Sequence, residues 1–468
     1  MPASTRLTDP MYGAPDVLAV YGDAATVQRM LDVEAALARA EAACGVIPAG
    51  AAAPIEAACH VAEIDLDALA AAAPAGGNLA IPLVKQLTAA VARRDAQAAR
   101  YVHWGATSQD VIDTGAVLQL RDALACIDAQ LHAAAVACAA LARIHRDTLM
   151  VGRTWLQHAL PITFGLKAAG WLDALRRDRE RLARAAAQAA VLQFGGAAGT
   201  LASLGERAAD VAAALAHELD LELPALPWHT QPDRLAEAGA AMGIATGTLG
   251  KIARDVALCM QTEVGELAEP EAQGRGGSST MPHKRNPVGS AAIATAALRM
   301  PGLMATLHAG LVQEHERALG GWQSEWDTMP QIAALCAGAA HNARLLLQGL
   351  QVRPERMRAN LDATRGLILG EAAMLALGGR MGRLQAHELV EAASRHATEH
   401  GLSLPQALRV VLDRDPDTAG LLDDAEIARL ADPARYTGQA GAFVDRVLAQ
   451  WDAAEQAATR ALPGLADK

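Results

Sequence analysis

The sequence predicts an all-α protein, because its composition, its apolar periodicity and its scarcity of strand signals all favour helices. Hydrophobic residues make up 52% of the 468 residues and aromatic residues only 3%. Most of the apolar residues are Ala and Leu, which are strong helix formers. Few segments show the alternation of polar and β-branched residues that is typical of strands. We therefore expect helices throughout the chain.

Apolar residues recur at helical spacing in six segments. In the first of them, Val27, Met30 and Leu31 share one face, and Gly45 ends the pattern. The longer segments would form helices of ~30 residues and about 45 Å. The six expected helices are residues 25–45, 110–146, 162–193, 234–268, 287 to beyond 310, and 328–350.

The length of the chain predicts a three-domain subunit, since 468 residues exceed one ordinary hydrophobic core. We expect an N-terminal helical domain at 1–115, a central helix-bundle domain at 116–355 and a C-terminal helical domain at 356–468. The long central helices carry more apolar surface than one subunit can cover. The bundle is therefore expected to form the core of a homotetramer.

The charge and the first residues of the chain limit the classes of partner. The formal net charge of −11 disfavours binding to nucleic acid or to an anionic membrane. If the substrate is an anion, its positive counter-charges must therefore be local. The sequence shows neither a secretory signal nor 18 uninterrupted apolar residues, so we expect a cytoplasmic location without a membrane span. The six cysteines form no CxxC pair and are expected to be reduced.

The strongest candidate for chemistry is the Gly-rich segment 274–287, Gly-Arg-Gly-Gly-Ser-Ser-Thr-Met-Pro-His-Lys-Arg-Asn-Pro. It carries two adjacent hydroxyls and Lys284. Asn286 suits a helix cap and Pro287 the first helical position. Free N–H groups at that helix start, together with Lys284, would form an anion site. The plain alternative is a flexible loop before a helix.

Two further segments carry polar clusters. Thr107 and Ser108 stand at the expected start of a long helix, where hydroxyl groups suit a carboxylate ligand or simple capping. In 152–161, Trp155 and His158 are three residues apart, which on a helix would place them on one face. A lone histidine is more often structural. Weaker polar clusters occur at 228–231 and 314–317.

Together these segments resemble the fumarase/aspartase superfamily, which includes adenylosuccinate lyase, argininosuccinate lyase and fumarase. Residues 278–287 are similar to the signature of the superfamily, residues 107–110 to its first shared region and residues 152–161 to its second. The resemblance extends over essentially the whole chain. It implies a homotetramer whose active sites draw these three regions from three subunits, with no metal or organic cofactor.

The resemblance also implies a role for each matching residue. Ser279 would transfer a proton at the carbon next to a carboxylate, with Ser278 the less favoured choice and His158 a second candidate for the transfer. Lys284 and Asn286 would hold the carboxylate that gains negative charge. The other residues expected to contact the substrate are His103, Thr107, Ser108, Thr154, Trp155, Gln231 and Arg317.

Three departures from the superfamily pattern are informative. The lyases commonly carry His after the Arg-Thr of the second region and Glu five residues after the loop Asn. Here these positions hold Trp155 and Ala291. The two missing residues act in the superfamily as one general-acid pair. Trp326 stands where adenylosuccinate lyases carry an Arg for the nucleotide phosphate, so a nucleotide substrate is not expected.

With these departures, the chain is similar to the lactone-forming branch of the superfamily, the bacterial 3-carboxymuconate cycloisomerases. In that chemistry the group that is added or expelled is the substrate's own carboxylate. A carboxylate has a pKa near ~4, so it leaves without a general acid. The resemblance implies a small tricarboxylate substrate. Two alternatives stay open, namely another lyase such as adenylosuccinate or argininosuccinate lyase, and a non-catalytic structural relative.

Overall fold

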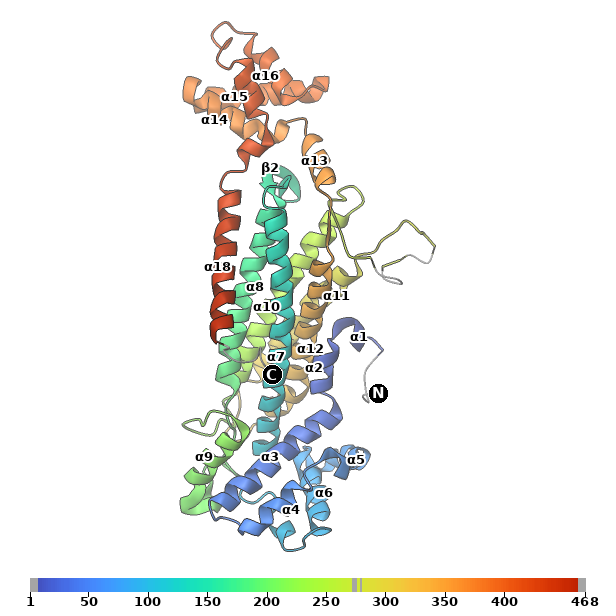
Figure 1. Cartoon of the computed structure of the whole chain (residues 1–468), viewed down its shortest axis with the longest axis vertical. Coiled ribbons are helices and arrows are strands. Elements are labelled where there is room, and N and C mark those ends of the chain that lie inside the picture. The colour runs from blue at the N-terminus through green and yellow to red at the C-terminus, as the bar shows by residue number, and fades with distance from the viewer. Residues whose placement is uncertain (1–6, 272–275, 278–279, 462–468) are drawn as a thin grey trace. The chain divides into compact units, whose positions relative to one another are not determined.

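The computed structural model describes residues 7–271, 276–277 and 280–461, and it confirms the expected all-α class (Figure 1). Among these residues, strands form only two short two-stranded sheets. Five long helices of 22 to 37 residues dominate the middle of the sequence. They are α7 (Ser108–Ile144), α8 (Phe164–Ala189), α10 (Asp233–Met260), α11 (Val288–Ala309) and α12 (Gly321–Gln348).

Shorter helices precede, join and follow these five. The N-terminal ones are α1 (Asp9–Tyr12), α2 (Pro15–Val20), α3 (Asp23–Ala43), α4 (Ala52–Glu56), α5 (Leu66–Gly76) and α6 (Ala80–Ala92). The later ones are α9 (Ala208–Leu219), α13 (Pro354–Asp362), α14 (Gly370–Met381), α15 (Arg383–His400), α16 (Leu404–Leu412), α17 (Asp424–Leu430) and α18 (Ala440–Ala461).

The chain divides into two compact units, and every boundary between them falls within a long helix. Unit 1 comprises residues 1–132, 177–251 and 291–344, and unit 2 comprises 133–176, 252–290 and 345–468. Each unit is a set of residues of one chain that lie mainly in contact with one another. The division into domains at 1–115, 116–355 and 356–468 stays a prediction.

All six expected helices are observed, and most of their ends lie within four residues of the expected ones. The largest differences are in α12, which begins at Gly321 instead of residue 328, and in α10, which was expected to reach residue 268 but ends at Met260. Just beyond this end, the carbonyl of Gln261 accepts hydrogen bonds from the N–H groups of Val264 and Gly265. Gly265 has φ +61°, a left-handed conformation that glycine adopts without strain. The chain then forms β3 (Leu267–Ala268), which pairs with β4 (Gln351–Val352).

The expectation that Trp155 and His158 share a helix face is wrong, because their segment forms a β-hairpin. β1 (Leu149–Thr154) pairs antiparallel with β2 (Gln157–Thr163). The two turn residues, Trp155 and Leu156, have φ values of 51° and 64°. Two successive positive φ values are typical of the type I′ turns that join hairpin strands. Such turns usually carry Asn-Gly, and the sequence offers no such signal here.

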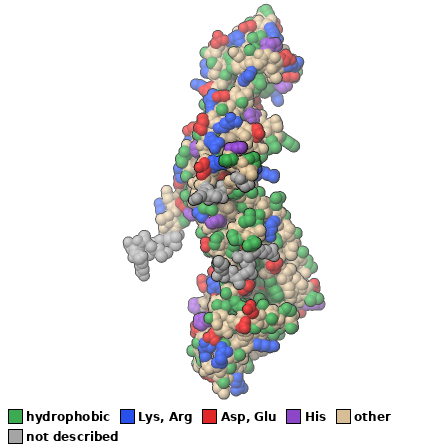
Figure 2. Space-filling model, turned by 90° about the vertical axis from the view of Figure 1, so that its right-hand side faces the viewer, with side chains coloured by type: hydrophobic (Ala, Val, Ile, Leu, Met, Phe, Trp, Pro, Cys, Tyr) green, Lys and Arg blue, Asp and Glu red, His purple; other side chains and the backbone are tan. Residues whose placement is uncertain are grey.

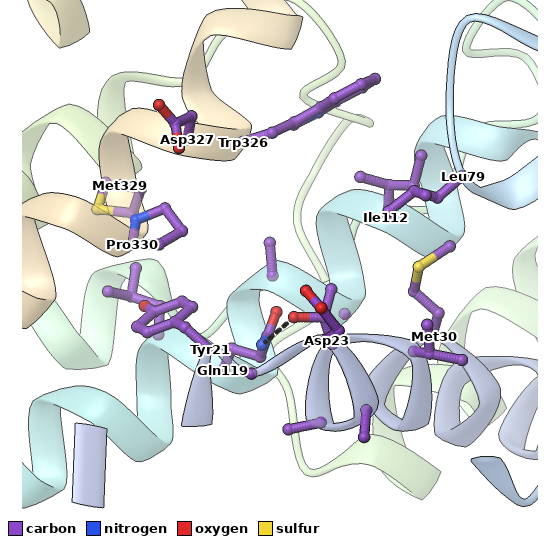
Figure 3. Close-up of a pocket in the computed structure, with 18 of the residues that line it drawn as sticks. Tyr21, Asp23, Met30, Leu79, Ile112, Gln119, Trp326, Asp327, Met329 and Pro330 are labelled. Atoms are coloured by element: carbon purple, nitrogen blue, oxygen red, sulfur yellow. Dashed lines mark hydrogen bonds between the residues drawn. The ribbon is translucent and has the colours of Figure 1, made fainter. Parts of the chain in front are cut away.

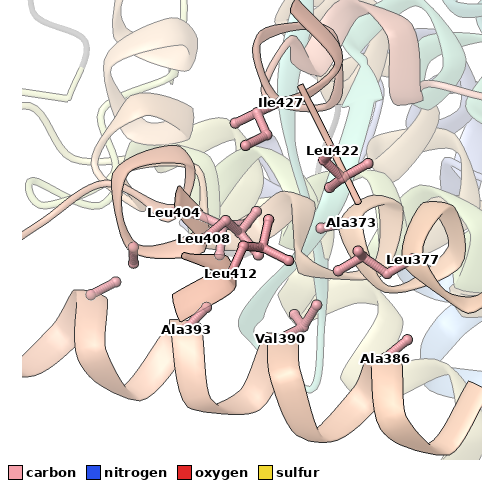
Figure 4. Packing of buried hydrophobic residues seen from close by; sticks show 12 residues of the cluster. Ala373, Leu377, Ala386, Val390, Ala393, Leu404, Leu408, Leu412, Leu422 and Ile427 are labelled. Carbon is pink, nitrogen blue, oxygen red and sulfur yellow. The ribbon is translucent and has the colours of Figure 1, made fainter. Parts of the chain in front are cut away.

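The C-terminal part of unit 2 has an apolar core of its own, shown in Figure 4. Helix α16 begins with a capping box formed by Ser403 and Gln406, and α17 with one formed by Asp423 and Glu426. These caps fix where both helices begin, and thereby which side chains face the core. The large side chains of the core are Leu377, Val390, Leu404, Leu408, Leu412, Leu422 and Ile427.

Helix α11 leaves much of its apolar surface uncovered within one chain. By length and composition, α7 and α11 could each cross a membrane, a test that core helices of soluble proteins also pass. Only 28% of the most apolar stretch of α11 is buried, and Leu298 is 81% exposed. Figure 2 shows hydrophobic side chains reaching the surface in patches on one face. Uncovered apolar surface on a long helix is typical of a subunit interface.

We predict that Leu298→Glu weakens a homotetramer built on these helices. A charged side chain in an apolar interface would have to lose its hydration without gaining a partner. Light scattering after size exclusion should give about four times the mass of one chain for the wild type, and a smaller mass for the variant. The matched control is Leu384→Glu on α15, where the leucine is 72% exposed. A monomeric wild type at micromolar concentration would contradict the prediction.

Candidate functional site

In unit 1, the buried carboxylate of Asp110 connects the loop before α7 to two distant segments. Its Oδ1 accepts hydrogen bonds from the N–H of Gly195 (2.9 Å) and from Nε2 of His229 (2.8 Å). Its Oδ2 accepts from the N–H groups of Gly196 (2.9 Å) and Thr107 (3.0 Å). Asp110 is only 2% exposed, so these four bonds replace the water that the carboxylate loses on burial.

Glycine is required at the contact with His229. A Cβ atom on Gly195 would lie 2.8 Å from Cε1 of His229 and 2.8 Å from Cβ of Pro227. Real Cβ atoms do not approach heavy atoms so closely, so a side chain here would force the two segments apart. The Gly195-Gly196 pair therefore lets the backbone reach Asp110.

Arg317 brings a guanidinium group to the same place. Its Nε donates to Oε1 of Gln109 (3.0 Å), and its Nη2 donates to Oγ1 of Thr107 (3.2 Å) and to the carbonyl of Ala197 (3.2 Å). Gln109 is fully buried, and its Nε2 donates to the carbonyl of His229 (2.8 Å). A guanidinium beside a hydroxyl is suited to binding a carboxylate. The structure thus brings together two of the residues expected to contact substrate, Thr107 and Arg317.

His103 lies in the loop that leads to Thr107, and it has a left-handed backbone with φ +58°. Its Nδ1 is 2.6 Å from Oε1 of Glu34, a residue of α3 that is 1% exposed. Burial alone would lower the pKa of His103, but the carboxylates of Glu34 and Asp110 together raise that pKa above its ordinary value. The imidazolium form of His103 is therefore favoured.

Two more buried acids, Asp113 and Glu325, lie in the same unit. Nε1 of Trp322 donates to Oδ1 of Asp113 (2.6 Å), and Nε2 of Gln313 donates to Oε1 of Glu325 (2.7 Å). Burial raises the pKa of Asp113 to about 7, against the hydrogen bonds from Trp322 and Gln109. Burial, and next the charge of Asp113, raise the pKa of Glu325 to about 8. Near neutral pH, both groups therefore carry less negative charge than an ordinary carboxylate.

A cavity of about 780 Å³ lies beside these acids (Figure 3). Tyr21, Asp23 and Gln119 line one side of it, and Trp326 and Asp327 lie across from them. None of the expected site residues that the structure describes lines this cavity. Its lining is mainly apolar, and its charged groups are acidic, so it does not suit a polyanion. The candidate site in unit 1 is therefore the cluster around Thr107, Arg317 and His103.

Ser108 and Gln231 belong to unit 1 as well. Ser108 is the first residue of α7 and is half-buried, whereas Gln231 is exposed in the turn that follows Trp228. Within the part of the chain that the structure describes, neither side chain has a hydrogen-bond partner. Both can therefore donate to a ligand, and their role in binding stays a prediction.

In unit 2, the hairpin carries Thr154, Trp155 and His158, and all three are exposed. Trp155, at the tip, is 97% exposed. Close to the turn, where Arg153 pairs with His158 in the register of the two strands, Arg153 forms a bidentate pair with Glu266, with N–O distances of 2.9 and 2.7 Å. Burial, and next the charge of Arg153, lower the pKa of His158. A neutral imidazole at that position can accept a proton near neutral pH.

The catalytic serine expected from the sequence, Ser279, lies outside the described residues. Lys284 is exposed, and Asn286 is half-buried. The N–H of Asn286 donates to the carbonyl of Gly276 (2.8 Å), and Gly277 forms a bridge with Arg285. Gly276 and Gly277 are therefore held against Arg285 and Asn286 just before α11 begins.

The expectation of free N–H groups at the start of α11 is wrong. Oε2 of Glu269 accepts a hydrogen bond from the N–H of Gly289 (2.9 Å). Its Oε1 accepts from the N–H and the hydroxyl of Ser290, both at 2.7 Å. Glu269 is 4% exposed. The positive end of this helix is thus already neutralised by a carboxylate of the chain.

One group of metal-ligand side chains occurs among the described residues, namely His396, Glu399 and His400 on α15, with ligand atoms within 4.8 Å of one another. A guanidinium nitrogen of Arg414 lies 3.4 Å from Nδ1 of His396. This cation opposes a metal ion, and none of the expected site residues belongs to the group. We assign it no metal.

Sequence reasoning missed the residues that hold the site in place, chiefly Glu34, Gln109 and His229. A usable signal existed for Glu34, since a carboxylate on an otherwise apolar helix face indicates a buried partner. Gln109 lies within the first shared region, but no contact with the substrate was expected for it. His229 is 119 residues from Asp110 along the chain, and no local pattern connects the two.

We predict that Asp110→Ala lowers the free energy of unfolding by about 3–5 kcal/mol, because four buried donors lose their acceptor. Urea unfolding followed by circular dichroism at one fixed protein concentration measures the change. The matched control is Asp210→Ala, which removes an exposed ion pair with Arg207 and should leave stability nearly unchanged. Equal effects of both substitutions would contradict the prediction.

Comparisons with known proteins agree with the fold and with the motifs. Residues 9–302 match the family described as Lyase, and residues 366–447 match Adenylosuccinate lyase C-terminus. The 3-carboxy-cis,cis-muconate cycloisomerase of Pseudomonas aeruginosa is 54% identical over 447 residues, 96% of each chain. Nitrosuccinate lyase of Streptomyces davaonensis is 44% identical over 450 residues, 94% of each chain.

A solved structure shows the same similarity. The crystal structure of 3-carboxy-cis,cis-muconate lactonizing enzyme from Pseudomonas putida has a TM-score of 0.90 and 49% sequence identity, and the match covers 96% of this chain and 99% of that one. Fold, motifs and relatives therefore lead to one assignment: the chain belongs to the lyase family that its motifs resemble, the fumarase/aspartase superfamily.

Proposed function

We propose that this chain is a cycloisomerase that converts 3-carboxy-cis,cis-muconate to 4-carboxymuconolactone in the breakdown of aromatic compounds. The observation that carries this proposal is the 54% identity, over 96% of both chains, to a relative with that name. The relative of that name from Bradyrhizobium diazoefficiens is 54% identical over 446 residues. We further propose a cytoplasmic homotetramer.

The reaction needs no external nucleophile. One carboxylate of the substrate adds to C4 of the conjugated diene, so a C–O bond forms within the same molecule, and proximity favours this step. The electron pair of the double bond moves toward a second carboxylate, which passes through an aci-carboxylate form. A proton is then added at the carbon next to that carboxylate. Ser279, or His158 as second candidate, would transfer this proton.

Cations beside the substrate would stabilise the charge that develops. Arg317 and His103 support such a role in unit 1, since one is always charged and the other is favoured in its charged form. In unit 2, Lys284 is exposed and free to approach an anion, whereas the guanidinium of Arg153 is already paired with Glu266. These local cations let an acidic chain with net charge −11 bind a tricarboxylate.

The loss of the general-acid pair fits lactone chemistry. Trp155 and Ala291 replace the His and Glu that resemblance would place there. A carboxylate leaving group does not require protonation, so an apolar wall can take the place of the acid. Trp155 is almost fully exposed in one chain, which supports a role against another subunit or a ligand rather than in a core.

The other lyases of the superfamily that stay as alternatives cleave their substrates into two products. A non-catalytic structural relative would neither cleave nor lactonise a substrate. The conjugated diene of 3-carboxymuconate absorbs ultraviolet light, and lactonisation removes this absorbance. The wild-type chain should therefore abolish the absorbance and yield one product, identified by NMR as 4-carboxymuconolactone. An unchanged absorbance, with turnover of a succinyl substrate instead, would favour another lyase.

We predict that Ser279→Ala lowers kcat on 3-carboxymuconate on the order of 10² or more, as expected for the loss of a proton-transfer group. Trp155→Phe, which keeps an apolar ring at the tip of the hairpin, should retain most of the activity and serves as the control. Both are measured by steady-state kinetics after the oligomeric state has been checked. A Ser279→Ala enzyme with near wild-type kcat would exclude the serine from proton transfer.

We also predict that two inactive variants restore part of the activity when their subunits assemble into one tetramer. If Ser279 and His158 act in one site but come from different chains, a mixture of Ser279→Ala and His158→Ala subunits contains some sites with neither substitution. Refolding the two inactive variants together should restore a fraction of the activity, whereas either variant refolded alone should not regain it. Hybrids that remain inactive, although each substitution alone is inactivating, would contradict shared sites.

A further inference from the structure

We propose that Glu34 is a positioning residue that holds His103 as an imidazolium, so that Nε2–H of His103 serves as a cationic donor to a carboxylate of the substrate. The identity of the ligand rests on the proposed function. The pairing of Glu34 with His103 does not, and it can be tested without a ligand.

The geometry fixes which nitrogen of the ring is free. Nδ1 of His103 is 2.6 Å from Oε1 of Glu34, and a carboxylate can only accept, so Nδ1 carries a proton. Glu34 is 1% exposed, while the His103 side chain remains 18% exposed. Among the residues that the structure describes, Nε2 of His103 has no hydrogen-bond partner. This nitrogen is therefore available to a ligand.

A second carboxyl group on the same helix shows what His103 contributes. Glu41 lies two turns after Glu34 on the buried face of α3, about 10 Å further along the axis. Neither oxygen of Glu41 has a partner in the described part of the chain. Burial, and next the charge of Glu34, raise the pKa of Glu41 to about 9, so Glu41 stays protonated near neutral pH. Glu34 differs in having a cation beside it.

The backbone around His103 is held in the conformation that the pairing needs. His103 has φ +58°, and Gly105 has φ +73°. A Cβ atom on Gly105 would lie 2.5 Å from a methyl carbon of Leu204, and the Ser203 hydroxyl donates to the carbonyl of Gly105 (3.3 Å). A non-glycine residue in the left-handed region costs free energy, which is typical of residues that serve a site.

The charged groups that face His103 come from two helices. Glu34 on α3 and Asp110 on α7 are both carboxylates, and both favour the imidazolium. Asp110 forms its four hydrogen bonds with other groups, and among the described residues Glu34 is the carboxylate that hydrogen-bonds the ring. The raised pKa of His103 sets the direction of the pH dependence. The imidazolium is present below that pKa and is lost as the pH rises through it, so KM should rise there.

Titration of the histidines tests the pairing without substrate. In the wild-type protein labelled with ¹³Cε1-histidine, the His103 resonance, assigned with His103→Gln, should titrate above the usual value near ~6.5. In Glu34→Gln, its midpoint should fall by about one pH unit or more. Glu41→Gln is the matched control and should leave the midpoint unchanged. A wild-type midpoint at or below the usual value would overturn the pairing, and so would equal shifts in both variants.

Kinetics test the role toward substrate. At neutral pH, Glu34→Gln should raise KM for 3-carboxymuconate up to about tenfold, following the lost imidazolium fraction, with a smaller effect on kcat. Its rise in KM with pH should begin at lower pH than in the wild type. An unchanged KM in a variant whose His103 midpoint has fallen would refute the contact with substrate. A wild type that titrates as expected but does not turn over 3-carboxymuconate would instead refute the proposed function.

Discussion

The buried carboxylate of Asp110 is the interaction on which the rest of unit 1 depends. It accepts hydrogen bonds from three backbone N–H groups and one imidazole, and these donors come from three separate stretches of sequence. A neutral side chain of the same size could not satisfy all four donors. By fixing the start of α7 against the Gly195-Gly196 turn, Asp110 also determines where Thr107 and Gln109 lie. Arg317 is placed, in turn, by these two residues.

The buried carboxyl groups around Asp110 differ in the partners that compensate their burial. Asp110 and Glu34 each have a cation or several donors beside them. Burial outweighs the hydrogen bonds to Asp113 and Glu325 and acts on Glu41 without a partner among the described residues, so the pKa values of these three acids rise. Their raised pKa values reduce the negative charge of these acids, so the cations Arg317 and His103 contribute more to the local electrostatic potential. An acidic protein can in this way present a positive site to an anion without a positive surface.

The sequence predicted the helices better than it predicted the contacts between them, and the roles of the candidate site residues stay predictions. The periodicity of α3 and α7 is local information, so their ends were found within two residues. The turn at Trp155 and Leu156 was missed because bulky residues rarely adopt positive φ, and tertiary packing outweighed that preference. The cap on α11 was missed for another reason. Glu269 reaches it across 20 residues, and no spacing rule connects a carboxylate to a helix start so far away.

The same contact has a consequence for how this enzyme family can vary. Glu269 joins the chain before the Gly-rich segment to Gly289 and Ser290 after it, so these two points are fixed against each other. The entropic cost of closing a loop grows only with the logarithm of its length, about 0.6 kcal/mol for each doubling. Residues can therefore be inserted or removed between these points without displacing α11. The start of α11 thus depends on Glu269 rather than on the number of residues between the two points.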